Sequence, residues 1–307
     1  MPMNCADYSL PKPPMPPNNN NLTSALSRQM QHLRQQVDRT DLKMLQLLQQ
    51  RTKLSGQIGK MKRRHGAVIY VPERERELIS RLIRRSRGRL SPRAVAGIYR
   101  EIFSSSRAAQ GQAPIGLLRA SFSQVLPAAR WCFGACDQFS PKKSRTELMK
   151  GVETGALSLA LLTGDDLLGA LRTPRQRSGF FSRLTVAGDF FPDSDSKAPL
   201  GRRIFIVTPR GNGAALKASR ILILIECKST VNAIKSLLRS MPDFPIHAEH
   251  LTRPSAPNRR VVVLGRLTLA QPTDGIHATS HLLAACKSAG LPVSILGIYP
   301  GAEDYGG

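Results

Sequence analysis

The chain has 307 residues, of which 41% are hydrophobic, and a formal net charge of +24. This length predicts two or three domains with buried cores. No stretch reaches the roughly 18 uncharged apolar residues of a membrane-spanning helix, and the N-terminus lacks a secretory pattern, so we expect a cytoplasmic protein. The odd number of cysteines, five, argues against a disulfide framework, and their spacing completes no zinc site.

The positive charge is concentrated in one part of the chain. Residues 31–110 hold 19 Lys/Arg and 6 Asp/Glu, a net charge of +13. A basic surface attracts anions of any kind through long-range steering. The charge therefore leaves three alternatives open: nucleic acid, a small dianion in a pocket, or an arginine-rich composition without a partner.

Residues 24–112 are predicted to form three helices. Apolar residues recur at three- and four-residue steps over 24–64, without proline, which predicts a long amphipathic helix. Pro72 suits the first turn of a second helix that runs to about residue 86. Ser91 is placed to cap a third helix, which begins at Pro92 and continues to about residue 110. The preceding residues 1–23, rich in Pro and Asn, are expected to be disordered.

The length of the first helix predicts a homodimer. A helix of about 40 residues is about 60 Å long, and two short helices cannot cover it within one subunit. Its apolar stripe needs a partner, and a second copy of the chain is the simplest one.

After Gly111 the pattern changes to α/β. Short apolar runs rich in β-branched residues predict strands at 115–118, 157–162, 204–207, 221–225, 261–264 and 293–296. Helical stretches lie between some of these runs, at 144–154, 231–239 and 278–289. Residues 170–200 are predicted to be a loop.

Several polar residues of the helical part are arranged together. Arg51 and Lys62 are eleven positions apart, which places them within about 20° of one helix face. Arg34 lies about 100° away from that face, so it would reach the partner's pocket more easily than its own. Ser106 and Gln110, at i and i+4, share a face of the third helix. A single residue of this kind usually lies on the solvated surface. Only the joint arrangement of these residues and their order along the chain indicate a site.

The same residues carry a resemblance to a known family. Residues 33–41, 47–51 and 58–62 resemble the first helix of the all-helical, type II chorismate mutases. The pattern continues at 70–75 and closes at 102–110. This resemblance covers about 80 residues and implies an intertwined three-helix domain that rearranges chorismate to prephenate, in phenylalanine and tyrosine biosynthesis.

The resemblance also implies roles for single residues. Arg51, with Arg34 entering from the other subunit, would hold the two carboxylates of chorismate. Lys62 and Gln110 would donate to the ether oxygen of the breaking C–O bond, and Glu75 would accept from the ring hydroxyl.

Two further residues of the second and third helices complete the implied set. Ser106 would assist a carboxylate, and Arg74 would add positive charge. Some relatives carry Asp where this chain has Val71. No cofactor or metal is implied, because the rearrangement needs oriented substrate and charge stabilisation only.

The remainder resembles a reduced prephenate dehydratase region (113–212) followed by an ACT-like domain (213–307). The dehydratase motif Thr-Arg-Phe is represented by Arg202-Arg203-Ile204, which lacks the catalytic hydroxyl. Val231 stands where the ACT effector loop usually has glycine. We therefore expect dehydratase activity to be lost, with phenylalanine left open as a ligand.

Three alternatives to a plain mutase remain. The first is a bifunctional chorismate mutase/prephenate dehydratase under phenylalanine regulation, and the second is a non-catalytic regulator. The third is a basic nucleic-acid-binding protein, which the aromatic content of 5% and the lack of a basic recognition helix with interleaved aromatics disfavour.

Overall fold

The computed structural model describes residues 20–171, 173–191, 199–210, 218–227, 247–255, 260–273, 275–288, 290 and 292–299. The chain divides into two compact units, residues 1–50 and 51–307, and each is described by itself. No helix in these ranges is both long and apolar enough to cross a membrane.

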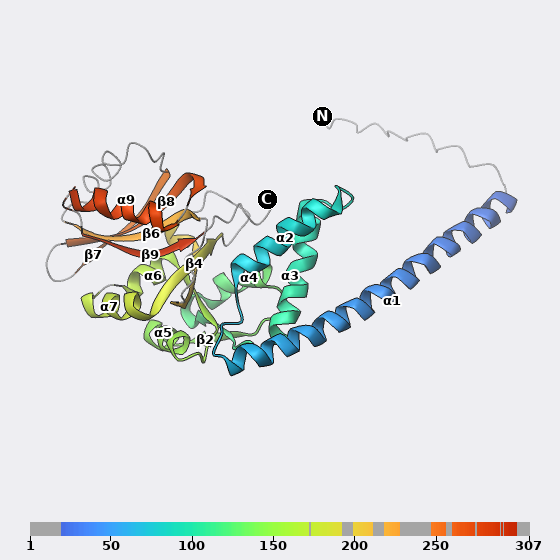
Figure 1. Ribbon diagram of the computed structural model, residues 1–307, viewed down its shortest axis with the longest axis horizontal. Helices are drawn as coiled ribbons and strands as arrows, with labels where there is room; N and C mark the ends of the chain where they lie inside the picture. Colours follow the sequence, from blue (N-terminus) through green and yellow to red (C-terminus); the bar gives the residue numbers. More distant parts are fainter. Residues whose placement is uncertain are drawn as a thin grey trace, which may run out of the picture. The chain divides into compact units, whose positions relative to one another are not determined.

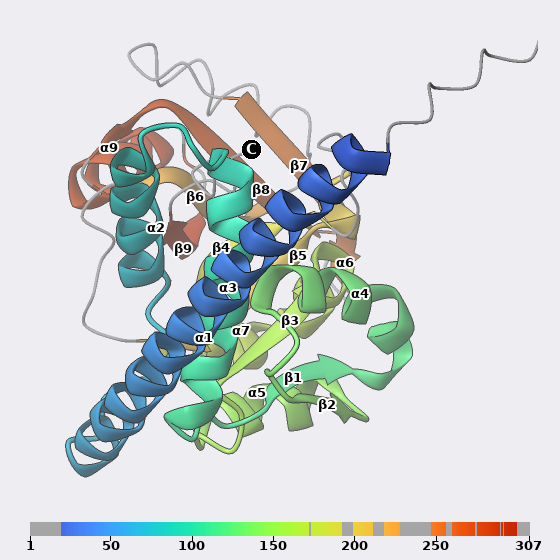
Figure 2. The same cartoon turned by 90° about the vertical axis from the view of Figure 1, so that its right-hand side faces the viewer.

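Three helices form the first part of the chain, as predicted: α1 (Asn20–Arg64), α2 (Pro72–Ser86) and α3 (Pro92–Ala109) (Figure 1). The N-terminus of α1 lies within the segment predicted to be disordered, and residues 1–19 fall outside the described ranges. Ser91 caps α3 as predicted, since its hydroxyl accepts from the Ala94 amide at 3.1 Å. Figure 2 shows α2 and α3 side by side as a helical hairpin.

The first unit consists, in its described part, of residues 20–50 of α1. The large apolar side chains of this helix segment are between 37% and 64% exposed. They are Leu26, Met30, Leu33, Val37, Leu42, Met44, Leu45, Leu47 and Leu48. This segment of α1 thus presents an extensive uncovered apolar surface.

A five-stranded sheet follows, with the strand order β2-β1-β3-β5-β4. Its strands are β1 (Ile115–Leu118), β2 (Phe139–Lys142), β3 (Leu159–Thr163), β4 (Leu184–Phe190) and β5 (Ile204–Pro209). β1 is parallel to β2 and β3, whereas β5 is antiparallel to β3 and β4. The accompanying helices are η1 (Arg119–Ser121), α4 (Phe122–Phe133), α5 (Arg145–Glu153), α6 (Gly164–Ala170), α7 (Pro174–Arg183) and η2 (Leu200–Arg202).

The prediction of a loop over residues 170–200 is wrong, because α7 and β4 lie there. Helix α7 begins with a capping box, in which the side chains of Thr173 and Gln176 each bond to the other's backbone amide, and with proline at its first turn. The helix itself is polar, so its apolar periodicity is weak. Its start signal is local chemistry that a search for apolar runs does not detect.

A second, four-stranded sheet has the order β7-β8-β6-β9, with every neighbouring pair antiparallel. It comprises β6 (Ala218–Cys227), β7 (His247–Ser255), β8 (Arg260–Thr273) and β9 (Val293–Tyr299), with α9 (Gly275–Ser288) before the last strand. This order is that of split β-α-β domains. The helix predicted at 231–239 and the Val231 position lie outside the described residues, and an ACT-like domain stays a prediction.

The two sheets share a core, which includes Val186, Leu222 and Leu296. Within this core Asp189 of β4 forms ion pairs with three buried arginines. Its carboxylate accepts from Arg203, from Arg220 at 3.0 Å and from Arg266 at 3.5 Å.

Candidate active site

Arg51 of α1 and Ser106 of α3 are in direct contact. The Arg51 guanidinium donates to Ser106 Oγ and, at 3.3 Å, to the carbonyl oxygen of Ile102. Its carbon Cζ also lies 5.6 Å from the centre of the Phe103 ring, which is within cation–π range. The planar fork of Arg51 is therefore held half-buried, with a hydroxyl beside it.

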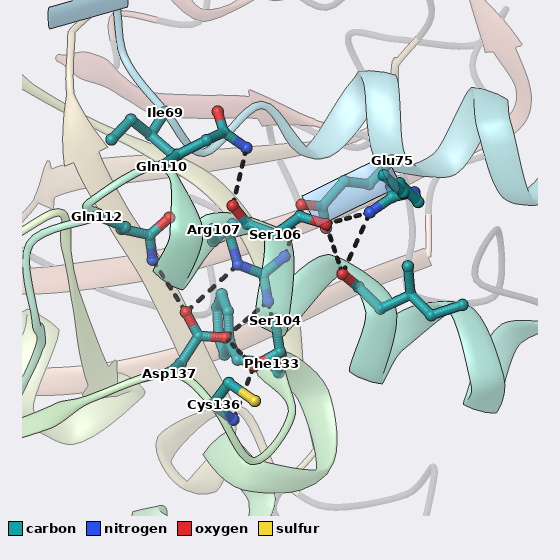
Figure 3. Close-up of polar contacts among 12 residues, drawn as sticks. Ile69, Glu75, Ser104, Ser106, Arg107, Gln110, Gln112, Phe133, Cys136 and Asp137 are labelled. Atoms are coloured by element: carbon teal, nitrogen blue, oxygen red, sulfur yellow. Dashed lines mark hydrogen bonds and ion pairs between the residues drawn. The ribbon is translucent and has the colours of Figure 1, made fainter. Parts of the chain in front are cut away.

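Gln110 and Lys62 lie at the ends of their helices. Gln110 Nε2 donates to the Ser106 carbonyl at 3.2 Å, while Oε1 is buried without a hydrogen-bond partner (Figure 3). Lys62 Nζ donates to the carbonyl oxygen of Ile69 at 2.9 Å. Gly59 lets α1 approach Gln110 closely, because a Cβ at this glycine would lie 2.5 Å from the Gln110 Cα.

Glu75 of α2 pairs with Arg107 of α3. Arg107 Nη1 donates to Glu75 Oε1 at 2.5 Å. Burial raises the pKa of Glu75 above its ordinary value, while Arg107 and Arg51 oppose the rise and Asp137 adds to it. Helix α2 starts at Pro72 with Val71 as its N-cap, which makes no side-chain cap bond.

The charged groups of the site act on one another. Burial lowers the pKa of Lys62, Arg74 lowers it further, and Glu75 raises it. Burial likewise lowers the pKa of Arg51, with Glu75 again acting in the opposite direction. Two partly buried cations thus lie in the field of a single carboxylate, and the excess of positive charge suits an anion.

Six of the seven predicted site residues fall in the second unit: Arg51, Lys62, Arg74, Glu75, Ser106 and Gln110. Arg34 is exposed on α1 in the first unit. Sequence reasoning missed Arg107 and Asp137. Arg107 shares its helix face with Arg100, Phe103 and Ser104, and this pattern gave no signal of a buried role. Asp137 gave no signal.

Cationic and neutral donors, with one carboxylate, thus converge on a site built from helices. Among the residues described, no group of three or more His, Cys, Asp or Glu side chains is placed to hold a metal ion. The fold and the site define an all-helical domain with clustered cationic and neutral hydrogen-bond donors. Residues 33–111 match the family model of chorismate mutase type II, and this part of the chain is a chorismate mutase type II domain.

Curated relatives match part of this chain. The bifunctional chorismate mutase/prephenate dehydratase of Aquifex aeolicus is 31% identical over 130 residues, which cover 41% of this chain and 36% of that protein. The T-protein of Haemophilus influenzae is 31% identical over 84 residues, or 27% of this chain and 22% of the relative. The match therefore spans well under half the length of each of these relatives.

Among solved structures, the chain matches the prephenate dehydratase from Streptococcus mutans. It is 13% identical, with a TM-score of 0.38, and the match covers 61% of this chain and 97% of that one.

Proposed function

We propose that the protein is a chorismate mutase, which converts chorismate to prephenate. The observation that carries this proposal is that Arg51 and Gln110 both donate to Ser106, while Lys62 lies in the field of Glu75, inside a type II chorismate mutase domain. Because the match covers only part of each relative, the activity of the whole protein rests on this site and on the test below.

The reaction suits these residue types. A Claisen rearrangement transfers no proton and needs no nucleophile. Its barrier falls when the enolpyruvyl arm is held over the ring, which in good cases contributes about 7–11 kcal/mol. A preorganised donor to the ether oxygen, where negative charge grows as the bond stretches, contributes about 3–4 kcal/mol.

The carboxylates of chorismate are assigned to arginine. Arg51 offers a fork that can donate two parallel hydrogen bonds to a carboxylate. In the free protein this fork binds the Ser106 hydroxyl and the Ile102 carbonyl, which the substrate carboxylate would partly replace. Ser106 then remains as a neighbouring hydroxyl, and Arg74 adds positive charge at the site.

The ether oxygen is assigned to Lys62 and Gln110. One N–H of Gln110 Nε2 donates to the Ser106 carbonyl, so its second N–H remains for the substrate. Lys62 has three donors, of which one binds Ile69. Glu75 is assigned to the ring hydroxyl, and its bond from Arg107 uses Oε1, which leaves Oε2 to accept.

A homodimer is part of this proposal. The exposed apolar side chains of α1 support it, since α1 has 45 residues and is about 68 Å long. A second α1 is a partner of matching length and pattern. Arg34 would then enter the other subunit's site and bind the second carboxylate.

Turnover is proposed to end at prephenate. Arg203, from the segment that resembles the dehydratase motif, is buried against Asp189 and is therefore not available to a substrate. Its neighbour Arg202 stands in place of the catalytic threonine, and a permanently charged guanidinium cannot supply a proton near neutral pH.

The test is chorismate consumption by the purified full-length protein and two variants. Lys62→Ala removes a donor to the ether oxygen, and turnover is expected to fall at least about 100-fold. Lys60→Ala, an exposed lysine on the same helix, is the matched control and should match the unaltered protein. Equal rates for the two variants would contradict the assignment, and no enzyme-dependent consumption by the unaltered protein would contradict the proposed function.

A further inference from the structure

Arg107 is a buried cation that contacts the proposed site through Glu75. Its side chain is 3% exposed. Besides Nη1, which donates to Glu75, Nη2 donates to Asp137 Oδ2 at 2.7 Å and to the Phe133 carbonyl at 2.5 Å, and Nε donates to Asp137 Oδ1 at 3.3 Å (Figure 3). One guanidinium therefore joins Glu75 of α2 to the last residue of α4 and to the segment that follows it.

Asp137 is held as firmly as the arginine that it binds. Its side chain is 3% exposed, and it also accepts from Ser104 Oγ at 2.8 Å and from Gln112 Nε2 at 3.1 Å. Ser104 and Arg107 belong to α3, whereas Asp137 precedes strand β2. The carboxylate is thus a fixed anchor supplied by the α/β part of the chain.

The backbone around Asp137 is docked on α3 as well. The amide of Ala135 donates to Glu101 Oε2 at 2.9 Å, and the amide of Cys136 donates to Ser104 Oγ at 3.0 Å. Gly134 has φ +99°, and a Cβ there would lie 2.6 Å from the Ser104 Cβ. Only glycine permits this approach together with that backbone conformation.

We propose that Arg107 and Asp137 are positioning residues for Glu75, and that residues 133–137 of the α/β region thereby complete the mutase site. This inference rests on the proposed function, because it gives Glu75 its task. Arg107 binds one oxygen of the carboxylate and fixes the direction of the other. Asp137 holds Arg107 in place through two of its nitrogens, which a guanidinium allows and a lysine would not.

Electrostatics make the inference specific. The charged and titratable groups that act on Glu75 are Arg107 from α3, Arg51 and Lys62 from α1, and Asp137 and Cys132 from the α/β region. Arg107 lowers the pKa of Glu75, and Asp137 raises it. Loss of the arginine should therefore raise the pKa of Glu75, and neutralisation of Asp137 should lower it.

The variants separate this role from a merely structural one. Arg107→Met and Asp137→Asn each remove one charge with little change in size. If a single variant fails to fold, the double variant serves in its place. It removes both buried charges together, and proteins tolerate the loss of a buried ion pair better than a single buried charge that is left unpaired. Asp166→Asn is the control, since Asp166 forms a 2.9 Å ion pair with Arg145 in the same region but has no contact with Glu75.

The experiment is the pH dependence of kcat/KM for the full-length protein, which reports the pKa values of the free enzyme. We expect the acid limb to move to higher pH in Arg107→Met and in the double variant, and to lower pH in Asp137→Asn. The maximum of kcat/KM should fall by up to about 100-fold in each, because Glu75 loses its direction. Asp166→Asn should superimpose on the unaltered protein. The inference would be overturned if the acid limb stayed in place in the two single variants, or if it moved in the same direction in Arg107→Met and in Asp137→Asn.

A second readout does not depend on turnover. The carboxyl carbon of Glu75 can be titrated by ¹³C NMR, with its signal assigned by its loss in Glu75→Gln. The same two opposite shifts are expected there. If the unaltered protein leaves chorismate unchanged, the proposed function fails while this titration still decides whether Arg107 and Asp137 control Glu75.

Discussion

The close approach of α1 to Gln110 makes the effect of one added methyl group predictable. In Gly59→Ala the new Cβ would lie 2.5 Å from the Cα, 2.6 Å from the carbonyl oxygen and 2.8 Å from the Cβ of Gln110. Ordinary carbon contacts begin at about 3.5 Å, so Gln110 must move by about 1 Å. Two of these three atoms are backbone, and no side-chain rotation relieves the clash.

A shift of that size in a donor to the reacting oxygen can cost about 100-fold in rate. The change also favours helix α1 by up to about 1 kcal/mol, so the fold should persist. Gly56→Ala is the matched control one turn earlier, where the nearest atom to the new Cβ would be the Ala109 carbonyl oxygen at 3.6 Å. Initial rates of chorismate consumption compare the two variants. Equal rates in folded proteins would refute the placement of Gln110 at the reacting oxygen.

Four further predictions concern charge and assembly. Gln110→Glu should move the activity optimum to acid pH, because a carboxyl group donates only when protonated, and an unchanged profile would remove Gln110 from its role. In the unaltered protein kcat/KM should fall at acid pH as Glu75 is protonated, with a pKa above the ordinary 4.5. It should fall at alkaline pH as Lys62 loses its proton, with a pKa below the ordinary 10.5. An acid limb below 4.5 or an alkaline limb above 10.5 would contradict these assignments. Asp189→Asn should lower the free energy of unfolding by about 3–5 kcal/mol in denaturant titrations, because buried arginines lose their carboxylate. Leu45→Glu should shift the protein from dimer to monomer in sedimentation and reduce turnover, whereas a stable dimer would argue against α1 as the interface.

The helical part was accessible from the sequence because its signals are local. Pro72 and Pro92 suit first helical turns, and Ser91 caps α3 as its position indicated. Strands β1, β5 and β9 coincide with apolar runs that were recognised as strands. Helix α7 was missed because polar capping starts it, and little apolar periodicity supports it.

Arg107 and Asp137, which support Glu75, could not be predicted from the sequence. Arg107 lies in a stretch that was assigned to the family pattern, and its neighbours in sequence give no hint of a buried role. Its partner Asp137 is thirty residues further along, and no periodicity links the two. Only the packing of the segment 133–137 on α3 brings them together. The same holds for Asp189 and its arginines, of which Arg220 lies in β6, Arg266 in β8 and Arg203 directly before β5.

The most direct test of the mutase assignment is a ¹H NMR time course of chorismate with a catalytic amount of the full-length protein. We expect the signals of chorismate to be replaced one for one by those of prephenate, much faster than in buffer, and prephenate then to decay at its spontaneous rate only. Chorismate that disappears no faster with the protein than without it would contradict the account, and enzyme-dependent phenylpyruvate would contradict the claim that turnover ends at prephenate.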